Sequence, residues 1–278
     1  MFYRMRSIFK IISSIIVFQT IGFSLGTQFL AIPKNNFELI SGFNPMLSMQ
    51  FTRPTISATY GNWIADMKLT NISFSNGFNK GYGGLDLTYI SLNDLELRTE
   101  RPSDEPISYY SSSSYTLDTW YGRDFGTASI KLAARYLSIQ LYDENSDGFA
   151  IDFVVSKRIK DRYTLGAAIL NIGSIGEMYK EKPELPLRAI IGGQIDLDLK
   201  QIENEIAISF EKSTLVDGLI FRISDYIRYS NLQFMLGSQF SNSEISVSGG
   251  VNFTLGIYTI GYAVQVGSQA LGIPQYLN

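Results

Sequence analysis

The chain has 278 residues and contains neither histidine nor cysteine. This composition excludes a Ser-His-Asp triad, a cysteine nucleophile, a disulfide and the usual histidine or thiolate zinc site, so we expect no enzyme and no cofactor. The 23 basic and 26 acidic residues give a formal net charge of −3. That balance argues against a nucleic-acid partner, because such a partner calls for a basic patch.

The first 26 residues have the three parts of a secretory signal peptide. Arg4, Arg6 and Lys10 precede an apolar run over 11–23, and small residues follow up to Gly26. An uncleaved membrane anchor is the weaker alternative, because the run is short of the roughly 20 residues that a spanning helix needs. We therefore expect export, with cleavage after Gly26 leaving 20 basic against 26 acidic residues.

The segment 27–50 lacks the pattern that dominates the rest of the chain. Within it, residues 37–47 have the composition of a short turn or a plug. We expect 27–50 to be a periplasmic segment or a plug, and 51–278 to form one domain.

From residue 51 onward, apolar and polar side chains alternate in stretches that are separated by turn residues, which predicts strands. The clearest stretch, from Ile245 to Leu255, places Val247, Val251 and Phe253 on one face. About thirteen strands are expected, at 51–60, 63–70, 85–89, 108–121, 130–135, 149–158, 164–169, 187–200, 206–210, 219–223, 232–236, 245–255 and 258–267. Strands of roughly 10 residues match the roughly 9 to 11 that a tilted strand needs to cross a bilayer.

This pattern predicts an all-β fold, an antiparallel transmembrane β-barrel of about 14 strands, with 12 as the other possibility because single-chain bacterial barrels have even strand numbers. A soluble β-sandwich is the alternative. The barrel is favoured by the wide spacing of the turns, by ionic residues on the polar faces, and by 17 tyrosines and 18 phenylalanines that could form interfacial girdles.

The predicted connections are of two lengths, as in a barrel with short turns on one rim and longer loops on the other. Short turns are expected at 161–162, 230–231, 241–243 and Gly256, and long loops at 99–114 and 173–186. The serine run 111–114 is expected to be part of a solvated loop.

Five charged residues fall on predicted lumen faces: Asp66, Lys131, Arg135, Asp152 and Arg188. They are candidates for a charged lining that holds water or a polar plug. The alternative is that they form cross-strand pairs which fill a narrow lumen.

Two local motifs resemble ligand-binding sequences, and each also has a purely structural interpretation. Residues 143–148 reproduce the first half of an EF-hand loop, but the twelfth position is Val154, and the segment lies between strands, so we expect a polar hairpin loop. The glycine-rich stretch 81–84 has no helix after it, so it is not a phosphate-binding loop. We expect no metal site.

Several short motifs occur in a fixed order through the chain. They are Phe29-Leu30, Asn44-Pro45, Trp63 with Asp66, Gly126 to Lys131, Gly148 to Asp152, Asn171-Ile172-Gly173 and Leu185 to Arg188. In this order they resemble the PorV/PorQ family of outer-membrane proteins, relatives of the FadL-type fatty-acid channels. The resemblance implies a FadL-like barrel of 14 strands, in which Asn44, Pro45, Trp63, Asn171 and Gly173 have structural roles.

The resemblance also implies a function, because the best-known family members serve the type IX secretion system. We therefore expect a non-enzymatic accessory in the outer membrane, in contact with lipid and with secretion or cargo proteins. The alternative is a FadL-like channel for a hydrophobic small molecule, and a purely structural barrel is a third possibility. The segment 31–43 is shorter than in the family, which weakens the channel hypothesis because a channel needs a gate.

Overall fold

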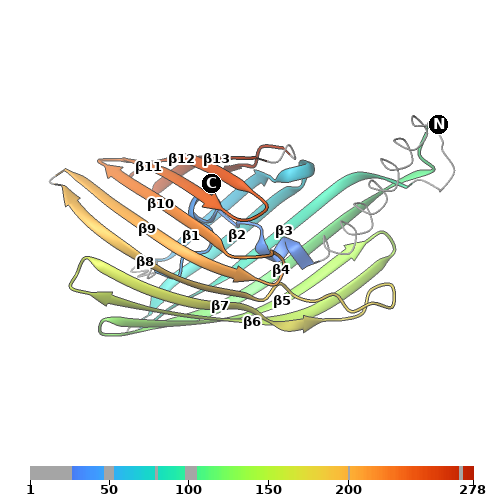
Figure 1. The fold of residues 1–278 in the computed structure, drawn as a ribbon, viewed down its shortest axis with the longest axis horizontal. Coiled ribbons are helices and arrows are strands. Elements are labelled where there is room, and N and C mark those ends of the chain that lie inside the picture. Colours follow the sequence, from blue (N-terminus) through green and yellow to red (C-terminus); the bar gives the residue numbers. More distant parts are fainter. Residues whose placement is uncertain (1–26, 47–52, 79–80, 98–104, 200, 269–271) are drawn as a thin grey trace.

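The computed structural model describes residues 27–46, 53–78, 81–97, 105–199, 201–268 and 272–278. They form a closed antiparallel barrel of 14 strands, in which neighbours in sequence pair with one another and β1 (Thr55–Asn62) pairs with β14 (Gln275–Leu277) (Figure 1). The predicted fold class is confirmed. The expected signal peptide, 1–26, lies outside the described residues.

The remaining elements follow in chain order. The strands are β2 (Lys68–Phe78), β3 (Gly81–Leu97), β4 (Ser108–Phe125), β5 (Ala128–Leu141), β6 (Glu144–Ile159), β7 (Tyr163–Ile175), β8 (Arg188–Leu199), β9 (Ile202–Ser213), β10 (Ile220–Tyr229), β11 (Leu232–Phe240), β12 (Ile245–Leu255) and β13 (Tyr258–Gly267). The helical turns are η1 (Phe29–Ala31), α2 (Asn36–Ser41) and η2 (Ile64–Asp66). No helix among the described residues has the length and apolar character needed to cross a membrane.

The connections alternate between two rims. The short-turn rim carries the turns 126–127, 160–162, 230–231 and 256–257. At the turns after β4 and β12, Gly126 and Gly256 have φ values of 72° and 62°, a left-handed conformation that glycine adopts without steric penalty. The long-loop rim carries the connections 176–187 and 214–219, together with the shorter turn 241–244.

The outer wall of the barrel is apolar on every side. On β5 the outward Leu132 is 52 % exposed while Ala133 is buried, and on β12 the outward Val247 and Phe253 alternate with buried serines such as Ser246. Soluble proteins rarely expose contiguous apolar surfaces larger than a few hundred Å². Because the barrel is closed, each strand pairs with a neighbour on both sides. The hydrocarbon core of a membrane requires such pairing, since it offers backbone groups no other hydrogen-bond partner. We conclude that this wall faces lipid.

Residues 27–46, which we call the plug segment, lie inside the ring of strands (Figure 1, blue). Thr27 donates to the backbone oxygen of Glu184 in a connection of the long-loop rim. Tyr276 of β14 donates to the Pro33 oxygen at 2.8 Å, and α2 contacts β10 to β13. The segment thus runs along the lumen and is held from several sides of the wall.

Expectations for one serine run, one loop boundary and one strand differ from the structure. The serine run 111–114 belongs to β4 and not to a loop, and Ser114 faces inward and is buried. The loop expected from residue 173 begins only after Ile175. The fourteenth strand was not predicted, because the three residues of β14 are too few to display an alternating pattern.

Candidate functional site

The lumen holds two clusters of charged side chains that come from successive strands. The first, which we call the aspartate cluster, joins Lys34 of the plug segment to the wall. Lys34 and Arg135 both donate to Asp118, and Arg135 also donates to Asp152 at 3.1 Å and to the Asn171 side chain. Two cations and two carboxylates make the cluster neutral, and each charge has a partner.

A β-bulge shapes one end of the aspartate cluster. The pairing of β6 with β7 shifts register at this point, and Asn171 adopts a φ of 64°, which re-aims its side chain into the lumen. Its N–H donates to Asp152 at 2.6 Å and its amide donates to the Pro186 oxygen at 2.9 Å. Gly173 is needed nearby, because a Cβ there would lie 1.9 Å from the Phe149 oxygen.

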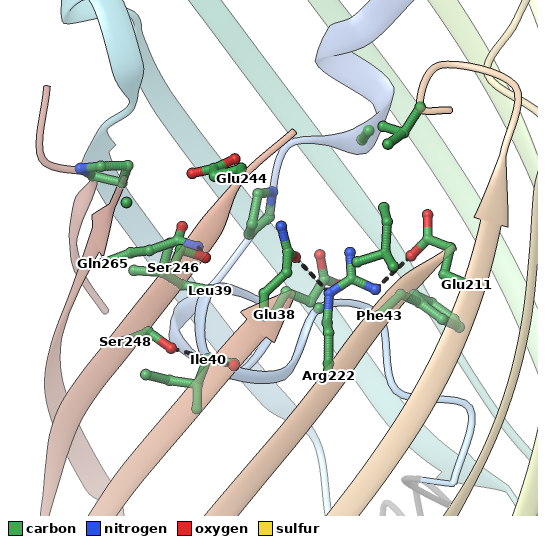
Figure 2. Close-up of a pocket in the computed structure, with 18 of the residues that line it drawn as sticks. Glu38, Leu39, Ile40, Phe43, Glu211, Arg222, Glu244, Ser246, Ser248 and Gln265 are labelled. Atoms are coloured by element: carbon green, nitrogen blue, oxygen red, sulfur yellow. Dashed lines mark hydrogen bonds and ion pairs between the residues drawn. The ribbon is translucent and has the colours of Figure 1, made fainter. Parts of the chain in front are cut away.

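The second cluster, which we call the arginine triad, lies on β8, β9 and β10. Arg188 donates to both oxygens of Glu211 at 2.6 and 2.9 Å. Arg222 donates to Glu211 at 2.6 Å and to the side-chain oxygen of Gln239 at 2.7 Å (Figure 2). All three charged residues are buried. One carboxylate shared by two guanidinium groups leaves the triad with a net positive charge.

Glycines in the wall make room for the backbone of the plug segment. A Cβ at Gly166 would lie 2.8 Å from the Pro45 carbonyl carbon, and one at Gly237 would lie 2.1 Å from the Ile40 oxygen. Ser248 donates to that same Ile40 oxygen at 3.3 Å (Figure 2). The plug segment is therefore packed into contact with the wall and does not hang free in the lumen.

Cavities remain around the plug segment. They include cavities of about 200, 120 and 80 Å³, and Glu38 and Phe43 line all three. The largest of these three, which we call the largest cavity, lies between the plug segment and β8 to β13, and its lining includes the arginine triad (Figure 2). It is smaller than the roughly 300–1,000 Å³ of a typical site for a drug-sized ligand, so it suits a smaller molecule.

Four of the five candidate lumen residues do line the interior. Arg135 and Asp152 belong to the aspartate cluster, and Arg188 belongs to the arginine triad. Lys131 has a different contact, with its ammonium 4.3 Å from the centre of the Trp120 ring, a distance at which a cation is attracted to the ring face. All four residues nevertheless border the cavity of about 80 Å³.

The prediction that Asp66 lines the lumen is wrong. Ala65 and Asp66 have φ values of 56° and 59° and form the turn η2 between β1 and β2, where Asp66 is exposed. The strand expected at 63–70 therefore begins only at residue 68. Its faces are also opposite to the expected ones, since Leu69 is buried and Thr70 is exposed.

Asn44, Pro45 and Trp63, to which the resemblance assigns structural roles, lie at the end of the plug segment and beside the largest of the three cavities. The Asn44 side chain accepts from the Met46 N–H at 2.8 Å, which fixes a turn around Pro45 at the end of the plug segment. The Trp63 ring lies 6.3 Å from that of Tyr276 and borders the largest cavity. The first contact shapes the end of the plug segment and the second joins the β1–β2 connection to β14.

The half EF-hand is part of a hairpin. A turn at Tyr142 and Asp143 connects β5 to β6, and the residues from Glu144 onward are paired in β6. Among the described residues no group of acidic side chains is arranged to hold a metal ion.

Sequence reasoning missed four of the residues that form the clusters: Lys34, Asp118, Glu211 and Arg222. Asp118 and Arg222 lay on polar faces of expected strands, between apolar neighbours, and could have been selected by that signal. Glu211 follows directly after the expected strand 206–210. Lys34 has no such signal, because it lies in a segment without alternation.

No family model matches the chain, and no curated protein matches it significantly. Similar solved structures include OccAB2 of Acinetobacter baumannii, with 10 % identity over 79 % of this chain and 82 % of that chain and a TM-score of 0.32. A mutant porin of Rh. blastica has 9 % identity over 80 % and 98 %, with a TM-score of 0.36. A BenF-like porin from Pseudomonas fluorescens has 8 % identity over 81 % and 96 %, with a TM-score of 0.30. Similarity at these TM-scores supports no conclusion about this protein. The assignment of a closed barrel depends on the strand pairing within this chain.

Proposed function

We propose that this protein is an outer-membrane β-barrel with a closed lumen, and that it acts as a non-enzymatic accessory of protein secretion or surface attachment, of the PorV/PorQ type. The observation that carries the proposal is the plug segment, which occupies the lumen and is packed against glycines of the wall. A barrel filled in this way offers its rims and outer wall to partners.

The outer-membrane location is supported by two features. The N-terminal sequence has the parts of an export signal. The apolar wall of the closed barrel suits a bilayer. With the long-loop rim facing the cell exterior, as is usual for such barrels, the connections 176–187 and 214–219 become the surfaces available to secretion or cargo proteins.

A FadL-like channel for a hydrophobic small molecule is the alternative function. The short segment 31–43 disfavoured this alternative in the sequence, because a channel needs a gate. In the structure, the plug segment could serve as that gate. The largest cavity, however, is lined by the arginine triad as well as by apolar residues, and such a lining does not favour a purely hydrophobic ligand. We therefore rank the channel second.

The test is membrane fractionation, followed by affinity purification of the tagged protein in mild detergent and mass spectrometry of the proteins that accompany it. Recovery in the outer membrane with stoichiometric secretion or envelope proteins is expected. Recovery alone with a bound lipid would favour the channel, and a soluble protein would refute both.

Conductance across a planar bilayer separates the two functions further. A closed accessory should show no steady conductance, whereas a variant that lacks residues 27–46 should open a pore if it folds. An intact protein that conducts ions steadily would contradict the closed lumen.

A further inference from the structure

We propose that the largest cavity is a binding site for a small zwitterion of the α-amino-acid class. In this site the arginine triad holds the carboxylate, and Glu38 and Glu244 hold the ammonium group. The inference goes beyond the proposed function and does not depend on a role in secretion.

The arginine triad lines the cavity and has guanidinium nitrogens without a partner among the described residues. The Arg188 Nη1 and Arg222 Nη2 groups have no hydrogen-bond partner within the part of the chain that the structure describes, although both side chains line the cavity. Guanidinium N–H groups bind a carboxylate through strong charge-assisted bonds. The excess positive charge of the triad supplies the attraction, because Glu211 neutralises only one of its two arginines.

The opposite charge comes from two carboxylates on other walls of the cavity. Within the described ranges, the Glu38 carboxylate of α2 accepts one hydrogen bond, from the backbone N–H of Lys34 at 3.0 Å. Glu244 lies in the turn between β11 and β12, and Figure 2 shows Glu244 and Glu211 to either side of Arg222. Neither Glu38 nor Glu244 forms an ion pair with any other described residue.

This separation of charge selects the class of ligand. A simple anion that binds the arginine triad would meet the repulsion of Glu38 and Glu244, whereas a simple cation would meet the repulsion of the triad. A molecule with a carboxylate at one end and an ammonium at the other satisfies both walls. Charges that border a cavity without full neutralisation are costly. The arginine triad keeps one excess positive charge, and Glu38 and Glu244 have no ion pair among the described residues.

The size and the opening of the cavity fit such a ligand. A volume of about 200 Å³ corresponds to about six or seven water molecules, at roughly 30 Å³ each. Trp63, Leu215 and Val216, which all come from connections of the long-loop rim, form an apolar part of the lining. An amino acid entering from that rim could place its side chain against them.

The experiment is calorimetric titration of the purified barrel in detergent with the twenty common L-amino acids, each tested individually. At least one should bind saturably. The tightest binder is then compared with its N-acetyl derivative, which lacks the ammonium group, and with its amide, which lacks the carboxylate. Each derivative should bind at least about tenfold more weakly, because each loses one set of charge-assisted contacts.

A variant and a matched control locate the site. Glu244→Gln lies in an exterior turn and should weaken binding of the amino acid about tenfold or more. Glu203→Gln removes an exposed carboxylate on β9 that pairs with Arg228, and should leave binding unchanged. The proposal is overturned if no amino acid binds, if either derivative binds as tightly as its parent, or if Glu244→Gln and Glu203→Gln behave alike.

Discussion

The aspartate cluster and the arginine triad use the same kinds of residue in the same lumen, yet they differ in charge balance. In the aspartate cluster, Lys34 and Arg135 are matched by Asp118 and Asp152, and the contacts tie the plug segment to the wall. In the arginine triad, two guanidinium groups share Glu211 beside a cavity. A balanced cluster is suited to hold structure together, and an unbalanced one beside a cavity is suited to bind.

The largest effect is expected from Glu211→Ala. Among the described residues, Glu211 is the one carboxylate that contacts both arginines of the triad, and a buried charge without its partner costs about 3–5 kcal/mol. Urea unfolding followed by tryptophan fluorescence should register the loss. Glu203→Gln, on the same strand but 67 % exposed at its side chain, serves as the control and should change stability by less than about 0.5 kcal/mol. A small loss for Glu211→Ala would indicate that the two arginines have another counter-charge.

Asp118→Asn should destabilise the protein less, by about 2–3 kcal/mol. Arg135 keeps Asp152 and Asn171 as partners, so the aspartate cluster retains part of its charge balance. The same unfolding measurement ranks this variant against Glu211→Ala. A greater loss for Asp118→Asn would reverse the comparison and make the aspartate cluster the more vulnerable one.

Gly237→Val tests the packing of the plug segment without altering any charge. The added Cβ would lie 2.1 Å from the Ile40 oxygen, so the plug segment or the strand must move, at about 1–3 kcal/mol. Gly249→Val is the matched control on the neighbouring strand, because its nearest atoms lie 3.9 Å away. Steady conductance should appear in the first variant and not in the second. Equal behaviour of the two would mean that the plug segment is not tightly docked.

The smallest effect is expected from Lys34→Met, at about 1 kcal/mol. The side chain of Lys34 is partly exposed and borders the smallest of the three cavities, and Asp118 keeps Arg135 as its partner. The change nevertheless removes the one ion pair between the plug segment and the wall among the described residues. Limited proteolysis should therefore cut the plug segment faster than in the parent protein, with the barrel strands protected in both. Unchanged protection would show that backbone contacts alone hold it.

The outer wall was predictable because it obeys a local rule. Alternation with a period of two places every second side chain on the lipid face, so runs such as Ile245 to Leu255 reveal a strand and its orientation without knowledge of its neighbours. The rule failed where the backbone departs from an extended strand. At Ala65 and Asp66, left-handed residues turn the chain and shift the phase of the pattern that follows.

The sequence alone determined the barrel class and the inward direction of Arg135, Asp152 and Arg188. It also predicts an export signal. Only the tertiary structure decided which charges meet. Asp118 directly opposes Arg135 in the β4–β5 pairing, whereas Arg188 reaches Glu211 on a diagonal between β8 and β9. Such pairing depends on strand register, which turns and bulges set across many residues. The position of Lys34 could not be predicted from the local sequence either, because the path of the plug segment depends on the space inside the closed barrel.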